Sequence, residues 1–289
     1  MAADELLKWL DSPAPLRRPV LLVALDGFID AGSVASSASM FLRHRWLADM
    51  IAEFDGDAFI DYRARRPRVV VDNGIVRSVD WPRLQLFTAR TDGPHDVTLL
   101  LGPEPDMRWG AFVETVAQAC KRLGIELAVT LGAYPAAAPH TRPVGIVRAT
   151  NTLGSEAFSD IPGVTGYTGP VGAATALQAA LVEHDIPTVG LWAEIPHYIA
   201  GSPHPPGALA LVRRVAEALQ IEVDTTELEA AAKLHLEQVD EAVAEHEEAV
   251  AMVTGLERLS DSEDDDDALP TGEDLAAEIE RFLRSGSDE

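Results

Sequence analysis

The sequence has one cysteine and no long hydrophobic run, and each absence excludes a class of protein. A single thiol, Cys120, rules out a disulfide framework and a cysteine-based metal site. No stretch reaches the roughly 18 uninterrupted apolar residues of a membrane-spanning helix. The first residues, MAADELLKWLDS, are acidic where a secretory signal would be basic and then apolar. We therefore expect a cytoplasmic protein without a membrane partner.

Basic residues are few, and acidic residues outnumber them most strongly near the C-terminus. The formal net charge is −24 at pH 7. Residues 222–289 hold 23 acidic and 4 basic side chains, a net charge of −19, whereas residues 1–221 hold 24 and 19, a net charge of −5. A negative field of this kind repels phosphate backbones and anionic lipid. We therefore do not expect nucleic acid or a membrane surface as a partner.

The common motifs of catalytic and cofactor sites are absent as well. There is no G-x-x-x-x-G-K-[ST] or G-x-G-x-x-G loop for a nucleotide, and no G-x-S-x-G or H-E-x-x-H motif for a hydrolase. Cys120 lies within a helical apolar pattern, which does not favour a catalytic thiol. We therefore expect no cofactor and no metal, assign no catalytic residue, and favour a protein that is not an enzyme.

What the sequence does contain is a series of apolar runs that alternate with helical patterns. Five runs predict buried strands, at residues 20–25, 97–102, 125–131, 144–149 and 188–193. Helical spacing lies between or after them, at residues 31–46, 107–123, 171–184 and 206–220. This alternation is typical of a largely parallel sheet covered on both faces. Asn73 and Gly74, between two alternating runs, predict a hairpin that would make the sheet mixed.

The character of the chain changes after residue 221. We predict an α/β core domain over residues 1–221 and a long helical extension over residues 222–259, as one helix or a broken one. Residues 260–289 would form an acidic linker, SDSEDDDDALPTGED, followed by a short amphipathic helix at residues 273–283. The charge of the chain would therefore be concentrated outside its core.

The first candidate site is the loop DGFIDAG, residues 26–32, which directly follows the first predicted strand. Gly27 and Gly32 permit backbone conformations closed to other residues, and Asp30 is placed to cap the helix that begins near Ala31. A functional interpretation is also open, because Asp26 and Asp30 stand at the carboxyl end of a strand, where open α/β sheets bind ligands.

Three further polar loops border predicted strands and helices. They are LGAYPAAAPHTRP at residues 131–143, LWAEIPHYI at residues 191–199 and TGYTGPVGAATALQAA at residues 165–180. The last precedes a helix whose first N–H groups would be free to bind an anion or an incoming loop. A pocket at the strand ends would therefore draw on Asp26, Gly27, Asp30, Gly32, His140, Thr141, Arg142, Thr168, Gly169, Glu194, His197 and Tyr198.

Two interpretations of this candidate pocket remain open. Glu194, His140 and His197 could converge as metal ligands or as acid and base groups, since all three follow buried strands. Such an enzyme would be a hydrolase, phosphorylase or ligase acting on a small anionic or amide-bearing substrate. The alternative is a polar network that holds the loops together, because ligand spacing across separate loops is not diagnostic.

Taken in order and spacing, the four loops resemble the bacterial members of the proteasome assembly chaperone family, of the chaperone 2 type. The resemblance covers residues 18–220 and extends to the helical extension. It implies a three-layer α/β/α sandwich of the phosphorylase/hydrolase-like kind. Eukaryotic and archaeal members bind proteasome α-rings, and some use a C-terminal tail ending in a hydrophobic residue, a tyrosine and any residue. This chain ends in SGSDE, which departs from that pattern.

The resemblance implies no catalytic residue that could be transferred to this chain. We therefore expect a non-catalytic interaction protein that forms a homo-oligomer. Its expected partner is a protein, with proteasome subunits or a similar ring-shaped complex as the candidates.

Overall fold

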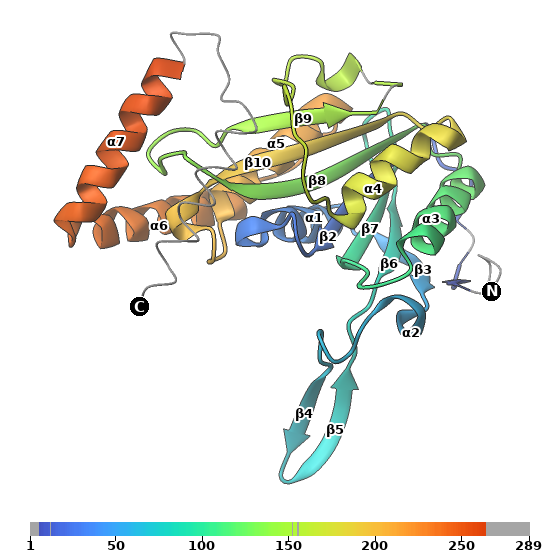
Figure 1. Cartoon of the computed structure of the whole chain (residues 1–289). Coiled ribbons are helices and arrows are strands. Elements are labelled where there is room, and N and C mark those ends of the chain that lie inside the picture. The colour runs from blue at the N-terminus through green and yellow to red at the C-terminus, as the bar shows by residue number, and fades with distance from the viewer. Residues whose placement is uncertain (1–5, 12, 152, 155, 264–289) are drawn as a thin grey trace.

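An eight-stranded sheet forms the centre of the structure, with the strand order β1-β3-β6-β7-β2-β8-β10-β9 (Figure 1). This computed structural model describes residues 6–11, 13–151, 153–154 and 156–263. The strands are β1 (Leu7–Trp9), β2 (Val20–Asp26), β3 (Asp49–Phe54), β6 (Gln85–Ala89), β7 (Val97–Pro103), β8 (Leu127–Ala136), β9 (Ile146–Thr150) and β10 (Thr188–Pro196). Strands β7, β2, β8 and β10 are parallel, and the outer strands pair antiparallel. The predicted α/β fold with a mixed sheet is confirmed.

Helices cover both faces of the central strands. Helices α1 (Val34–Arg45) and α5 (Pro205–Leu219) lie on one face, and α3 (Trp109–Leu123) and α4 (Ala173–Ala180) lie on the other. Along β2, alternate side chains enter the two cores, so all its residues up to Leu25 are buried. This double burial explains the continuous apolar run in the sequence. Parallel pairing places the carboxyl ends of β2, β8 and β10 at one edge of the sheet.

The predicted hairpin forms, but it does not join the main sheet. Strands β4 (Arg68–Asp72) and β5 (Ile75–Asp80) make a separate two-stranded sheet that projects from the body (Figure 1). Asn73 and Gly74 both have positive φ, at 50° and 74°, as a two-residue hairpin turn of this type requires. The expectation that this hairpin makes the main sheet mixed is therefore wrong. The antiparallel pairs come instead from β9 and from the edge strands β1, β3 and β6, of which only β9 was predicted.

Two helices follow the core and extend it beyond α5. Helices α6 (Thr226–Ala244) and α7 (Glu247–Glu263) are separated by a break at residues 245–246, so the predicted long helix is a broken one. α6 packs on α5, and α7 continues past residue 260 into the segment predicted as a linker. The remainder of that linker and the predicted helix at residues 273–283 lie outside the described residues. None of the described helices is long and apolar enough to cross a bilayer.

Candidate functional site

The loop after β2 is fixed by a buried aspartate and a close backbone approach. The Asp30 carboxylate accepts hydrogen bonds from the N–H groups of Ala35 at 2.7 Å and Ser36 at 3.3 Å, so it caps the first turn of α1. Burial raises the pKa of Asp30 above its usual value, and the bonds from Ser36 and Ala35 oppose that rise. Gly32 has φ +60°, and a Cβ there would lie 2.9 Å from the His204 Cβ. Both residues therefore serve loop packing.

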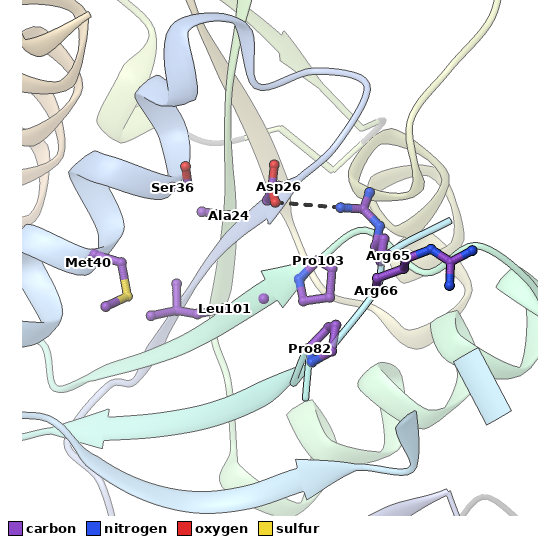
Figure 2. A pocket seen from close by; sticks show the side chains of 10 residues that line it. Ala24, Asp26, Ser36, Met40, Arg65, Arg66, Pro82, Leu101 and Pro103 are labelled. Atoms are coloured by element: carbon purple, nitrogen blue, oxygen red, sulfur yellow. Dashed lines mark hydrogen bonds and ion pairs between the residues drawn. The ribbon is translucent and has the colours of Figure 1, made fainter. Parts of the chain in front are cut away.

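Asp26 lies apart from this cap, beside a pocket between α1 and the base of the hairpin. Its carboxylate pairs with the Arg65 guanidinium at 3.5 Å, and Arg65 also lies 3.5 Å from Asp106. The pocket has a volume of about 330 Å³ (Figure 2). Of the twelve candidate residues, all within the described chain, Asp26 alone lines it. The remaining candidate residues therefore do not surround this pocket.

Glu104, which the sequence reasoning missed, joins two of the candidate loops. Its carboxylate accepts from the N–H of Phe28 at 3.0 Å and from the N–H of Ala173, at the start of α4, at 2.5 Å. A Cβ on Gly27 would collide with this side chain, which explains the glycine. The Ala173 N–H, expected to be free for an anion, is therefore occupied by an acid of the same chain. The sequence did hold a signal for Glu104, namely its position directly after a strand. Glu104 follows β7, and Asp26 ends the neighbouring strand β2.

His140 is buried and connects the core to α6. Its backbone N–H donates to the Tyr198 hydroxyl at 2.8 Å, and its Nδ1 lies 2.6 Å from the same oxygen. Its Nε2 lies 3.0 Å from a carboxylate oxygen of Asp240 on α6. Because a carboxylate oxygen can only accept, the contact with Asp240 is one in which Nε2–H donates. Both ring nitrogens are thus used in holding the loop to the extension.

The next two residues bind α7 in the same way. The Thr141 hydroxyl donates to Glu257 at 2.6 Å. The Arg142 guanidinium makes two parallel bonds to Asp261, from Nε at 2.8 Å and from Nη2 at 2.9 Å. The bond from Arg142 lowers the pKa of Asp261. We call residues 140–142 and their partners on α6 and α7 the extension clamp.

Glu194 and His197 have separate structural partners. Glu194, on β10, accepts a hydrogen bond from the Tyr134 hydroxyl on β8 at 2.7 Å. Burial, and then the Glu194 charge, raise the pKa of Tyr134. His197 Nδ1 lies 3.3 Å from the Ala136 carbonyl oxygen, and its ring packs edge-on against Tyr198 at 5.4 Å. These contacts hold Glu194 and His197 to residues of the same chain, and the convergence of Glu194, His140 and His197 on a ligand, which the sequence left open, stays a prediction.

Thr168 and Gly169 belong to an exposed loop beside the β2–α1 loop. The Tyr167 hydroxyl donates to the Pro170 carbonyl at 2.7 Å, which shapes this loop. Phe28, on the neighbouring loop, is 63% exposed, and Tyr167 and Val171 are also exposed. Glu104 bonds both loops, and we call the exposed side chains of Phe28, Tyr167 and Val171 on them the strand-end face.

The candidate residues therefore do not share one site: Asp30 and Gly32 pack the β2–α1 loop, Asp26 lines the pocket, and residues 140–142 belong to the extension clamp. Within the ranges described, no group of three His, Cys, Asp or Glu side chains is placed to hold a metal ion. The arrangement can present a firm apolar surface at the strand ends, because its loops are held by buried or charge-assisted bonds. It defines a three-layer α/β protein whose strand-end loops are held to a helical extension.

The chain belongs to the PAC2 family, whose model matches residues 24–243. The family resemblance expected from the four loops is confirmed by this match. A comparison with curated proteins found no match. The matched region runs from the end of β2 to the end of α6, so both His140 and the helix that it contacts lie within it.

Solved structures give the same result. A proteasome-assembly chaperone homologue of Mycobacterium tuberculosis is 34% identical, with a TM-score of 0.74, over 81% of this chain and 99% of that one. A Corynebacterium glutamicum protein of unknown function is 32% identical, with a TM-score of 0.83, over 89% of this chain and 98% of that one. An archaeal proteasome activator from Pyrococcus furiosus shares the fold at 16% identity and a TM-score of 0.62, over 82% of this chain and 97% of that one.

Proposed function

We propose that the protein is a non-catalytic, chaperone-like interaction protein that associates with a proteasome or a similar ring-shaped complex. The observation that carries the proposal is membership of the PAC2 family together with 34% identity to a proteasome-assembly chaperone homologue. We place its action in the cytoplasm and expect it to work as a homo-oligomer.

The contacts of the strand-end residues support a binding role over turnover. His140, Thr141 and Arg142 are engaged with α6 and α7, and Asp30 caps α1. A reaction centre would need such groups around a bound substrate. These side chains hold loops and helices in place. We therefore assign them to the support of a binding surface and not to a reaction.

The strand-end face is the surface that we assign to the partner. Phe28 is its most exposed aromatic side chain, and its backbone is held by Glu104. A large aromatic ring on a fixed loop loses little conformational entropy on binding, which is why such residues dominate interface energies. Phe28 is therefore the expected anchor.

A binding experiment with purified components tests this proposal. The full chain is immobilised and exposed to purified proteasome and to free α-type subunits, at low and at moderate salt. We expect retention at both salt concentrations and a loss of about tenfold or more in affinity for Phe28→Ala. Leu234→Ala is the matched control, because Leu234 is similarly exposed but lies on α6. No retention of either component by the wild-type chain would refute the association, and equal loss in both variants would refute the assigned surface.

A further inference from the structure

The pocket beside Asp26 has an apolar end and a cationic end. It lies between α1 and the base of the hairpin, and its volume is about 330 Å³. Met40 and Leu101 line one end, and the side chains of Arg65 and Arg66 lie at the other (Figure 2). Small-molecule sites in proteins begin at about this size and combine apolar walls with a few placed polar groups. The pocket therefore has the form of a site for a small ligand that is charged at one end.

Short side chains and the backbone keep this pocket open. Ala24 of β2 and Ser36 of α1 line it, and neither side chain is long enough to fill the space between helix and sheet. Gly102 of β7 lines it as well, with φ +142°, and a Cβ there would collide with the Arg83 carbonyl oxygen. The neighbouring backbone thus excludes a side chain at Gly102. The cavity is therefore set by the local sequence.

The apolar end offers carbon surface that the described part of the chain leaves uncovered. Met40 is a large apolar side chain, and it is 48% exposed. Leu101, Pro82 and Pro103 add further carbon surface to the lining. An apolar chain laid against these residues would leave water, and each methylene group buried in this way strengthens binding by about fourfold. This end therefore suits an unbranched hydrocarbon body.

The cationic end holds donors that the described chain does not use. Arg66 is exposed and makes no ion pair within the described residues. Arg65 lies 3.5 Å from Asp26 and 3.5 Å from Asp106, and its buried Nε has no hydrogen-bond partner among the described residues. A guanidinium group has five N–H donors in a planar fork, so these two long contacts leave donors of Arg65 available. An anionic group between the two arginines would gain charge-assisted hydrogen bonds.

The balance of charge at this end selects a singly charged anion. The lining carries the two positive charges of Arg65 and Arg66 and the negative charge of Asp26. A second negative charge on the ligand would meet the Asp26 carboxylate, and the formal net charge of −24 on the whole chain adds to that repulsion. A carboxylate has one charge, and its two oxygens match the planar guanidinium fork.

We propose that this pocket binds a small carboxylate whose unbranched apolar body lies along Met40 and Leu101, with the carboxylate group held by Arg66 and Arg65. The site is separate from the strand-end face, because none of the three side chains of that face lines the pocket. The inference goes beyond the proposed function, since it gives a protein with an expected protein partner a small-molecule ligand as well.

Isothermal titration calorimetry of the purified full chain with octanoate tests the site. We expect saturable binding with a dissociation constant of about 0.1–1 mM, as for a small ligand in a shallow site. Octanamide has the same chain without the charge, and butanoate has the same charge on a shorter chain. We expect each of them to bind about tenfold or more weakly than octanoate. Absence of saturable octanoate binding, or equal affinities for octanoate and octanamide, would overturn the proposal.

Two pairs of variants place the ligand in the pocket. Arg66→Gln should weaken octanoate binding about tenfold, whereas Arg63→Gln, at an exposed arginine of the same segment outside the lining, should stay within about twofold of wild type. Met40→Gln should weaken binding about fivefold or more, and Met50→Gln, at an exposed methionine on β3, is its control. Equal affinities within either pair would overturn this location of the site.

Asp26→Asn gives a result of opposite sign. It removes the negative charge beside the bound carboxylate and releases Arg65, so we expect octanoate to bind about threefold more tightly. Unchanged or weaker binding would contradict the assignment of the carboxylate to this end. Asp26, Met40 and Arg66 are all exposed, and the melting temperature of each variant verifies that its core is intact. No protein partner is present in this assay, so its outcome is independent of proteasome binding.

Discussion

His204 should make the protein less stable as the pH falls below neutrality. The ring is buried at the start of α5, where its Nδ1 accepts the Gly207 N–H at 3.0 Å, and it packs edge-on against His235 at 5.2 Å. Burial, and then the neighbouring His235, lower the pKa of His204 from 6.5 to about 4. A protonated Nδ1 could not accept the Gly207 bond, so the folded state holds the neutral ring.

The direction and size of this change in stability follow from the difference in proton binding between the folded and unfolded chains. Between pH 6.5 and about 4 the unfolded chain binds a proton at His204 that the folded chain does not bind. The free energy of unfolding therefore decreases as the pH is lowered through this range. At about 1.4 kcal/mol per pKa unit, the full loss is about 3 kcal/mol. His235, whose pKa burial also lowers, acts in the same direction.

Urea unfolding of the wild type and of His204→Asn at pH 7 and pH 4.5 measures this effect. Asparagine keeps a side-chain acceptor for the Gly207 N–H but has no proton to gain in this range, so its pH-dependent loss should be smaller by about 2 kcal/mol. His246→Asn, at an exposed histidine, serves as the control and should behave as wild type. Equal losses for wild type and His204→Asn would show that the His204 ring is not held neutral by burial.

Two further predictions concern the polar contacts of the loops. Arg142→Ala removes the two bonds to Asp261, and because both side chains are partly exposed we expect a small effect, seen as faster hydrogen exchange in α7. Unchanged exchange in α7 would contradict the extension clamp. Glu104→Gln keeps the shape of the side chain but removes the charge that holds Phe28 and Ala173, so we expect a loss of about 1–2 kcal/mol in unfolding free energy. The control Glu241→Gln, at an exposed position of α6, should leave the unfolding free energy unchanged.

Local features of the sequence were sufficient for much of the fold. The run at residues 20–25 predicted β2 because a strand buried on both faces is apolar throughout. Asn73 and Gly74 predicted the hairpin, since a two-residue turn needs positive φ at both positions. Asp30 was predicted as a cap, and it bonds within six residues of itself, where local chain geometry decides the contact.

Local features were not sufficient for the sheet edges. β1, β3 and β6 are short, and β3 contains a register shift between Met50 and Ala52 that breaks the alternation used to recognise a strand. Their pairing depends on β7 offering a free edge, which is a property of the assembled sheet. The position of the hairpin outside the main sheet is also a property of the assembled structure, and the periodicity of its sequence could not predict it.

The sequence by itself determined the α/β class, the central strands and the turn of the hairpin, because burial and backbone conformation at each position select the residue types found there. Only the tertiary structure decided what the polar loops do. His140 and Asp240 are 100 positions apart along the chain, and Thr141 and Glu257 are 116 apart, yet each pair is within hydrogen-bonding distance. Such contacts depend on how whole helices pack, and residue type alone cannot distinguish a ligand-binding side chain from one that binds the same chain.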